Sequence, residues 1–171
     1  MVKCIGLLAL VAAVGLGGVL KAEELKERIY LLEDFLKVAL DLKSRIQYFR
    51  QPLLQLFTET AAKGNSSGLK ILQRCAAGLK EKNGEIGALW AQAAEEIYGK
   101  TSLTQEDREV ICHLGTFIGQ TDYENQQVQF LYLQKRLEEQ MQAARDIYSR
   151  KGPMYRRIGF FGGAIAALVL L

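Results

Sequence analysis

The sequence contains few of the residues on which enzymes and metal sites most depend. It has one histidine and three cysteines among 171 residues, and Cys4, Cys75 and Cys112 lack the close spacing of zinc ligands. An odd number of cysteines also argues against a disulfide framework. Phosphate-binding loops of the GxxxxGK(S/T) type, GxSxG elbows and HExxH motifs do not occur. We therefore expect no catalytic residue, no metal site and no cofactor.

Two remaining candidates for chemistry have structural explanations. Cys112 and His113 are adjacent, and neighbours on a helix point about 100° apart, so they do not face each other. The paired carboxylates lie on predicted helix surfaces or in first turns, where solvation and the helix macrodipole explain them: Glu33-Asp34, Glu95-Glu96, Glu106-Asp107 and Glu138-Glu139. The sequence does not indicate an enzyme.

Proline and excess charge are also scarce. Only Pro52 and Pro153 interrupt the chain, which favours long helices. The net charge is +3, and the basic residues gather beside two apolar ends instead of forming a stripe interleaved with aromatics. Nucleic-acid binding is therefore not expected. Such an arrangement suits anionic lipid headgroups better.

The C-terminal end combines a basic collar with an uncharged run, Ile158–Leu171. As a helix this run reaches about 21 Å, short of a hydrocarbon core of roughly 30 Å, but a start at Met154 with snorkelling arginines would lengthen it. A core helix that ends the domain is the alternative, and it fits poorly because the run has no polar face. Gly159 and Gly163 form a small-residue face suited to transmembrane packing. The collar consists of Arg150, Lys151, Arg156 and Arg157.

The N-terminal end has a similar pattern. Cys4–Leu20 is uncharged and lies between Lys3 and Lys21, and it would extend about 26 Å as a helix. A secretory signal peptide is the alternative, but the positive start is short and Leu20 fits a cleavage site after Ala22 poorly. The chain continues with good helix formers, so we predict a retained anchor that runs on into the first domain helix. A second small-residue face consists of Ala9, Ala13 and Gly17.

Together these ends predict a two-pass membrane protein. The N-terminal anchor is 1–21, the central domain is 22–151 and the C-terminal anchor is 152–171. Lys21 and the collar flank the central domain, and the bias of basic residues towards the cytoplasmic side of a membrane places that domain in the cytoplasm.

The central domain is predicted to be all-α, a six-helix bundle of antiparallel hairpins. Apolar residues recur at three- and four-residue steps throughout it. Capping boxes at Thr104–Asp107 and Thr121–Glu124 open the last two helices, Gly119 is a plausible C′ residue between them, and Gly152-Pro153 predicts an interruption and a bend. The predicted helices span 23–49, 52–62, 68–82, 85–98, 104–117 and 122–150.

This order of features resembles the stage III sporulation protein AB family of endospore-forming bacteria, and the likeness covers essentially the whole chain. Its most specific part is the pattern LGxxxGxxDxxxQ within 114–126. Arg45 is a departure, because an acidic residue is expected before Ile-x-Tyr. Besides Trp90 and the two apolar ends, the resemblance lies in the segments 45–53 (RIQYFRQPL), 103–107 (LTQED), 114–126 (LGTFIGQTDYENQ) and 155–159 (YRRIG).

The resemblance implies a fold like the cytoplasmic domains of the inner-membrane platform protein of type II secretion and type IV pilus systems. It implies a component of the mother-cell-to-forespore channel complex, located in the mother-cell membrane that surrounds the forespore. The implied partners are a cytoplasmic secretion-type ATPase and other membrane subunits of the channel. Apart from the resemblance, we expect contact with the lipid bilayer and allow for a homo-oligomer.

The working hypothesis is therefore a non-enzymatic membrane platform or adaptor. A membrane-tethered helical sensor or regulatory module is the alternative, and it requires a pocket with convergent polar groups. Loops held by rigid hairpins often carry function, so we expect the partner to contact two turns. The predicted contact residues are Tyr48, Gln51, Pro52, Gln120, Asp122 and Glu124.

Overall fold

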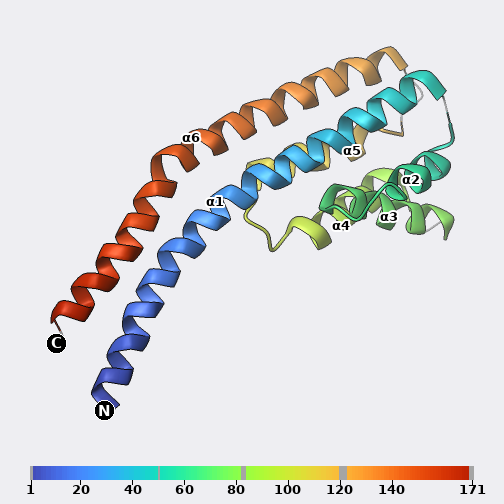
Figure 1. The fold of residues 1–171 in the computed structure, drawn as a ribbon. Helices are drawn as coiled ribbons and strands as arrows, with labels where there is room; N and C mark the ends of the chain where they lie inside the picture. Colours follow the sequence, from blue (N-terminus) through green and yellow to red (C-terminus); the bar gives the residue numbers. More distant parts are fainter. Residues whose placement is uncertain (1, 50, 82–83, 120–122, 170–171) are drawn as a thin grey trace. The chain divides into compact units, whose positions relative to one another are not determined.

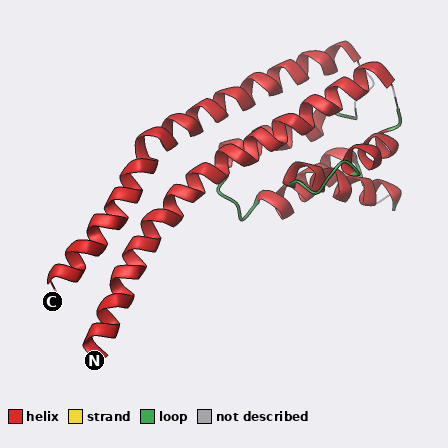
Figure 2. Cartoon of the chain, viewed as in Figure 1, coloured by secondary structure: helices red, strands yellow, loops and turns green. Residues whose placement is uncertain are grey.

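The computed structural model describes residues 2–49, 51–81, 84–119 and 123–169, with side chains placed throughout these ranges except at 2–16, 49, 123, 156 and 159–169. Every regular element in the described ranges is a helix (Figures 1 and 2). This confirms the all-α, six-helix prediction for that part of the chain. The elements are α1 (Val2–Phe49), α2 (Leu53–Ala61), α3 (Ser67–Lys80), α4 (Ile86–Tyr98), α5 (Gln105–Phe117) and α6 (Tyr123–Val169).

The chain forms two compact units. One, which we call the terminal unit, comprises Met1–Ile29 and Gln142–Leu171, and the other, the bundle unit, comprises Tyr30–Met141. Helix α1 is continuous from the predicted anchor into the predicted domain helix, as expected from the good helix formers after Lys21.

The sequence predicts an interruption at Gly152-Pro153, and this prediction is wrong. Helix α6 continues through both residues to Val169, far beyond the predicted end at Arg150. A proline in a helix removes one backbone hydrogen bond and crowds one carbonyl. The helix formers on both sides of Pro153 are sufficient to maintain the helix across that defect.

The membrane anchors gain no support from the structure. Where side chains are placed, no helix combines the length and the apolar character needed to cross a membrane. Most of the two apolar runs, 2–16 and 159–171, lies outside the residues whose side chains are described. The two-pass topology stays a prediction.

Local sequence signals set the helix starts. Thr104 accepts a hydrogen bond from the Asp107 amide at 3.2 Å, and Asp107 accepts one from the Thr104 amide at 2.8 Å, so the predicted capping box is present. Ser66 is the N-cap residue of α3, and its side chain accepts a hydrogen bond from the Leu69 amide. Pro52 was predicted as the first helical residue but is the N-cap of α2, because its ψ of 139° is extended. The second predicted capping box includes residues outside the described ranges.

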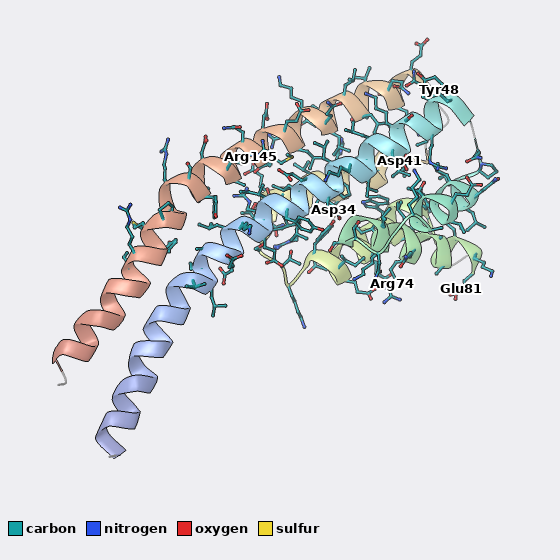
Figure 3. All side chains as sticks on the ribbon, viewed as in Figure 1. Asp34, Asp41, Tyr48, Arg74, Glu81 and Arg145 are labelled. Carbon is teal, nitrogen blue, oxygen red and sulfur yellow. The ribbon has the colours of Figure 1, made fainter. Side chains whose placement is uncertain are left out.

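Asp34 on α1 departs from the prediction of a solvated carboxylate. Its Oδ2 accepts a hydrogen bond from the Gly68 amide in the first turn of α3 at 2.8 Å, and Figure 3 shows it on the side of α1 that faces the short helices. A carboxylate at a helix N-terminus is favourable because the macrodipole is positive there. Asp34 thereby fixes α3 against α1 within the bundle unit.

Trp90 on α4 lies at the centre of the bundle core and is fully buried. Its indole Nε1 donates a hydrogen bond to the Ile111 carbonyl of α5 at 3.0 Å. Ring centroids of Phe35 on α1 and Phe57 on α2 lie 6.3 Å and 6.1 Å from the Trp90 ring. One side chain therefore joins four helices. Residues of the predicted apolar pattern are buried in the same unit, namely Leu72, Cys75, Ile111, Leu114, Leu133 and Leu137.

Candidate partner-binding surface

The described residues that border the two turns predicted to meet a partner lie at the same end of the bundle unit. Helix α1 ends there at Phe49 and α6 begins there at Tyr123, because these two helices run antiparallel (Figure 1). Gln120 and Asp122 lie outside the described residues, so their placement is not described. Tyr48, Gln51, Pro52 and Glu124 can be followed in the structure.

Tyr48 is an accessible aromatic residue at this end. Its side chain is 73% exposed, and Figure 3 labels it at the tip of α1. Pro52 and Glu124 are exposed as well, whereas Gln51 is half-buried and its Oε1 has no hydrogen-bond partner among the described residues. Leu54, at 40% exposure, adds an apolar side chain in the first turn of α2. The described part of this end is thus an aromatic and polar surface.

Arg45, the departure noted in the sequence, takes part in a network of charges between α1 and α2. Its guanidinium Nε lies 3.4 Å from Asp41 Oδ2, and its Nη1 lies 3.2 Å from Glu59 Oε2. Asp41 Oδ2 is also 2.7 Å from Lys63 Nζ. The Arg45 side chain is 22% exposed, so its charge is partly withdrawn from solvent. Isolated exposed ion pairs contribute little, but this network attaches α2 to α1 just below the candidate surface. Arg45 therefore has a role within the chain that does not require a partner.

The LGxxxGxxDxxxQ pattern is explained by packing at the same end. A Cβ at Gly115 would lie 2.6 Å from Trp90 Cβ, and a Cβ at Gly119 would lie 2.7 Å from Ile86 Cγ2, so both glycines let α4 approach α5 closely. Gly119 does not act through a positive φ, which among the described glycines occurs at Gly84 alone. Gln126 is buried, and its Nε2 donates to the carbonyls of Phe117 and Ile118 at 3.2 Å and 2.9 Å.

Gln126 therefore caps the C-terminal end of α5, where helix carbonyls lack intrahelical partners. We expect Gln126→Ala to lower the free energy of unfolding by about 2 kcal/mol, because buried acceptors would lose their donor. Gln134→Ala is the matched control, since Gln134 bonds only to Glu138 one turn along the same helix at 2.9 Å, and it should change stability by less than about 0.5 kcal/mol. Urea unfolding followed by circular dichroism measures both. Equal effects of the two substitutions would contradict the capping role.

Neither of the two described cysteine side chains, Cys75 and Cys112, is an activated thiol. Burial raises the pKa of the Cys75 thiol to about 12 and raises that of the half-buried Cys112 thiol, so both favour the neutral form. His113 Nε2 lies 3.0 Å from Gln129 Oε1, and its ring packs against Phe117 and Tyr132. No cluster of metal-binding side chains occurs in the part of the chain that the structure describes.

Two grooves on the surface of the bundle unit have room for a small ligand. The larger, about 560 Å³, lies between α3 and α4 and is lined by Lys70, Arg74 and Glu96 among others. The smaller, about 240 Å³, lies between α5 and α6 beside His113 and Arg136. In both grooves oppositely charged side chains pair with each other, Arg74 with Glu96 at 2.6 Å and Arg136 with Glu106 at 3.2 Å. These pairs neutralise the charges of Arg74 and Arg136, while neither Lys70 in the larger groove nor Glu109 in the smaller one forms an ion pair within the described ranges.

Comparison with known proteins decides the family. A family model described as "Stage III sporulation protein AB (spore_III_AB)" matches residues 3–171. The chain belongs to the stage III sporulation protein AB family. A solved structure titled "Stage III sporulation protein AB (SpoIIIAB)" shares the fold with a TM-score of 0.65 and 19% identity, over 71% of this chain and 96% of that chain. A search of curated proteins found no match.

In this stage III sporulation protein AB family member, the described residues of the predicted basic collar lie in the terminal unit and are exposed to solvent. Lys21, Arg150, Lys151 and Arg157 are exposed, and Met154 and Ile158 beside them are 45% and 56% exposed. Gly17 is also exposed, with open space where a Cβ would lie. The remaining members of the predicted collar and packing faces lie outside the residues whose side chains are described: Arg156, Ala9, Ala13, Gly159 and Gly163.

Sequence reasoning missed one surface of this family member. Val128, Leu131 and Tyr132 of α6 are 62%, 58% and 54% exposed, while Phe130 and Leu133 of the same helix are buried. A signal was present, because these three apolar residues recur at steps of three and one on the helix face opposite the core. The apolar periodicity of this helix was assigned to its core face alone, which left these three residues out.

Proposed function

We propose that this protein is a non-enzymatic platform or adaptor of the sporulation channel complex. In this role the bundle unit docks a cytoplasmic secretion-type ATPase and connects it to membrane subunits of the channel. Membership of the stage III sporulation protein AB family supports the setting. The absence of a reactive cluster among the described residues is compatible with a binding role.

We further propose that the terminal unit attaches the protein to the mother-cell membrane around the forespore, with the bundle unit in the cytoplasm. The supporting observation is the exposed basic collar next to the exposed apolar residues Met154 and Ile158. Lysine and arginine beside apolar surface suit the boundary between headgroups and hydrocarbon. The two uncharged runs at the ends of the sequence supply the apolar length.

A single observation carries the docking proposal, namely an aromatic side chain presented at the end of the bundle unit where α1 ends and α6 begins. Tyr48 is 73% exposed there, and exposing a ring to water gives folding no benefit. Tyrosine is one of the residues that most often supply binding energy in protein interfaces, because it buries much area with few rotatable bonds. Pro52, Leu54 and Glu124 are also exposed at this end.

The test is binding of the full chain, in detergent or nanodiscs, to the purified ATPase, with Tyr48→Ala compared with the parent. We expect Tyr48→Ala to weaken binding at least about tenfold, corresponding to about 1.4 kcal/mol. Tyr30→Ala is the matched control, because Tyr30 is 63% exposed on the same helix and lies about 27 Å away along it. It should leave the affinity unchanged.

Three results would count against this proposal in different ways. Equal loss for both tyrosine variants would point to a nonspecific effect, and no loss for either would place the contact away from this end. Absence of binding by the parent chain would reject ATPase docking altogether. In that case a sensor using the groove between α3 and α4 becomes the better explanation.

A further inference from the structure

The outward face of α6 in the bundle unit carries a short line of four exposed residues, which we call the outer seam. It consists of Glu124, Val128, Leu131 and Lys135, all exposed, with Val128 at 62% and Leu131 at 58%. Figure 3 shows side chains along this part of α6 projecting away from α1. Exposed apolar residues on consecutive turns of one face are a common mark of an interaction surface.

The spacing of the outer seam is that of a coiled coil. Steps of four, three and four residues keep all four side chains on one stripe of the helix, as the a and d positions of heptads do. This order of spacings, four, three and four residues, is the same whether the helix is followed from its N-terminus or from its C-terminus. A stripe of this kind can therefore face an antiparallel copy of itself in register.

The charges of the outer seam are complementary in that arrangement. A two-fold axis between Val128 and Leu131 places each Val128 opposite the Leu131 of the other copy. It also places each Glu124 opposite the Lys135 of the other copy, so both ends of the contact carry opposite charges. Neither Glu124 nor Lys135 forms an ion pair with any residue that the structure describes, so both are open to an intermolecular one.

We propose that the outer seam binds the outer seam of a second copy of this chain, as an antiparallel helix pair. A two-fold contact is self-complementary by definition, which is the property that the seam shows. Tyr132 lies at the margin, held edge-on by His113 with ring centroids 5.9 Å apart, and extends the apolar contact. Two apolar layers and two ion pairs make a small interface, of the size found in transient complexes.

The occupant could instead be a helix of another protein, but an unrelated helix would have no reason to match the mirrored order acid, apolar, apolar, base. The inference goes beyond the proposed function, because it concerns the association of the protein with itself. Its test contains no ATPase, so the result is independent of whether the docking proposal holds.

The experiment reverses the charges at the ends of the seam. Full chains carrying Glu124→Lys or Lys135→Glu are prepared in detergent with different tags, and self-association is measured by sedimentation equilibrium. Each single variant brings like charges together at both ends, so we expect self-association about tenfold weaker than that of the parent. A mixture of the two variants restores opposite charges at both ends, so heterodimers should form with the affinity of the parent.

The mixture is the decisive measurement. Neither single change touches the core, and circular dichroism checks that each variant folds, so recovery in the mixture cannot come from restored folding. A parent that stays monomeric up to several hundred micromolar would overturn the proposal. Self-association that is insensitive to either charge, or a mixture that does not recover, would overturn it as well, because the copies would then meet through another surface.

Discussion

Gly115→Ala is expected to lower the free energy of unfolding by about 2 kcal/mol. The added Cβ would lie 2.6 Å from both Cβ and Cγ of Trp90, which are atoms close to the backbone of a fully buried residue. Neither atom can move away without shifting α4 relative to α5, and overpacking of this kind costs about 1–3 kcal/mol. Urea unfolding of the full chain, followed by circular dichroism, measures the effect.

Gly87→Ala is the control for Gly115→Ala, and it should act in the opposite direction. Gly87 is the second residue of α4, and a Cβ there would approach the Gly115 carbonyl oxygen at 3.5 Å, an ordinary contact. Alanine in a helix is more favourable than glycine by up to roughly 1 kcal/mol, with the full value applying in the helix interior. If Gly115→Ala also stabilised the protein, the close approach of α4 and α5 would not be a feature of the native fold.

Trp90→Ala should have a larger effect, a loss of about 4 kcal/mol in the free energy of unfolding. The substitution removes a fully buried indole that contacts Phe35 and Phe57 and donates to the Ile111 carbonyl. A cavity between four helices would remain, because residues from α1, α2 and α5 surround the ring. The same urea unfolding experiment provides the measurement.

Trp90→Phe separates the two contributions of this side chain. Phenylalanine retains an aromatic ring beside Phe35 and Phe57 but cannot donate the hydrogen bond to Ile111. We expect less than half of the loss seen for Trp90→Ala. A phenylalanine variant as unstable as the alanine variant would show that the hydrogen bond, and not the buried volume, supports this part of the core.

The sequence by itself determined the helices and most of their starts. Thr104 and Asp107 form the predicted capping box because both partners lie within three residues of each other. Pro52 separates α1 from α2 because its ring excludes the residue before it from the helical region. The family resemblance also followed from the sequence, since the segment 114–126 carries its pattern. All of these signals are local, and they need no knowledge of what lies across the bundle.

Only the tertiary structure decided what the patterned residues do. The sequence marks Gly115 and Gln126 but cannot show that one admits Trp90 and the other caps α5, because those partners lie on another helix or across a turn. The sequence singles out Arg45 as unusual, and its pairing with Glu59 appears only when α2 packs on α1. Of the candidate surface, the sequence predicted the turns, while the antiparallel course of α1 and α6 brought them to one end. The outer seam is visible only in the tertiary structure, because exposure is a property of the packed bundle and periodicity alone cannot say which apolar residues remain uncovered.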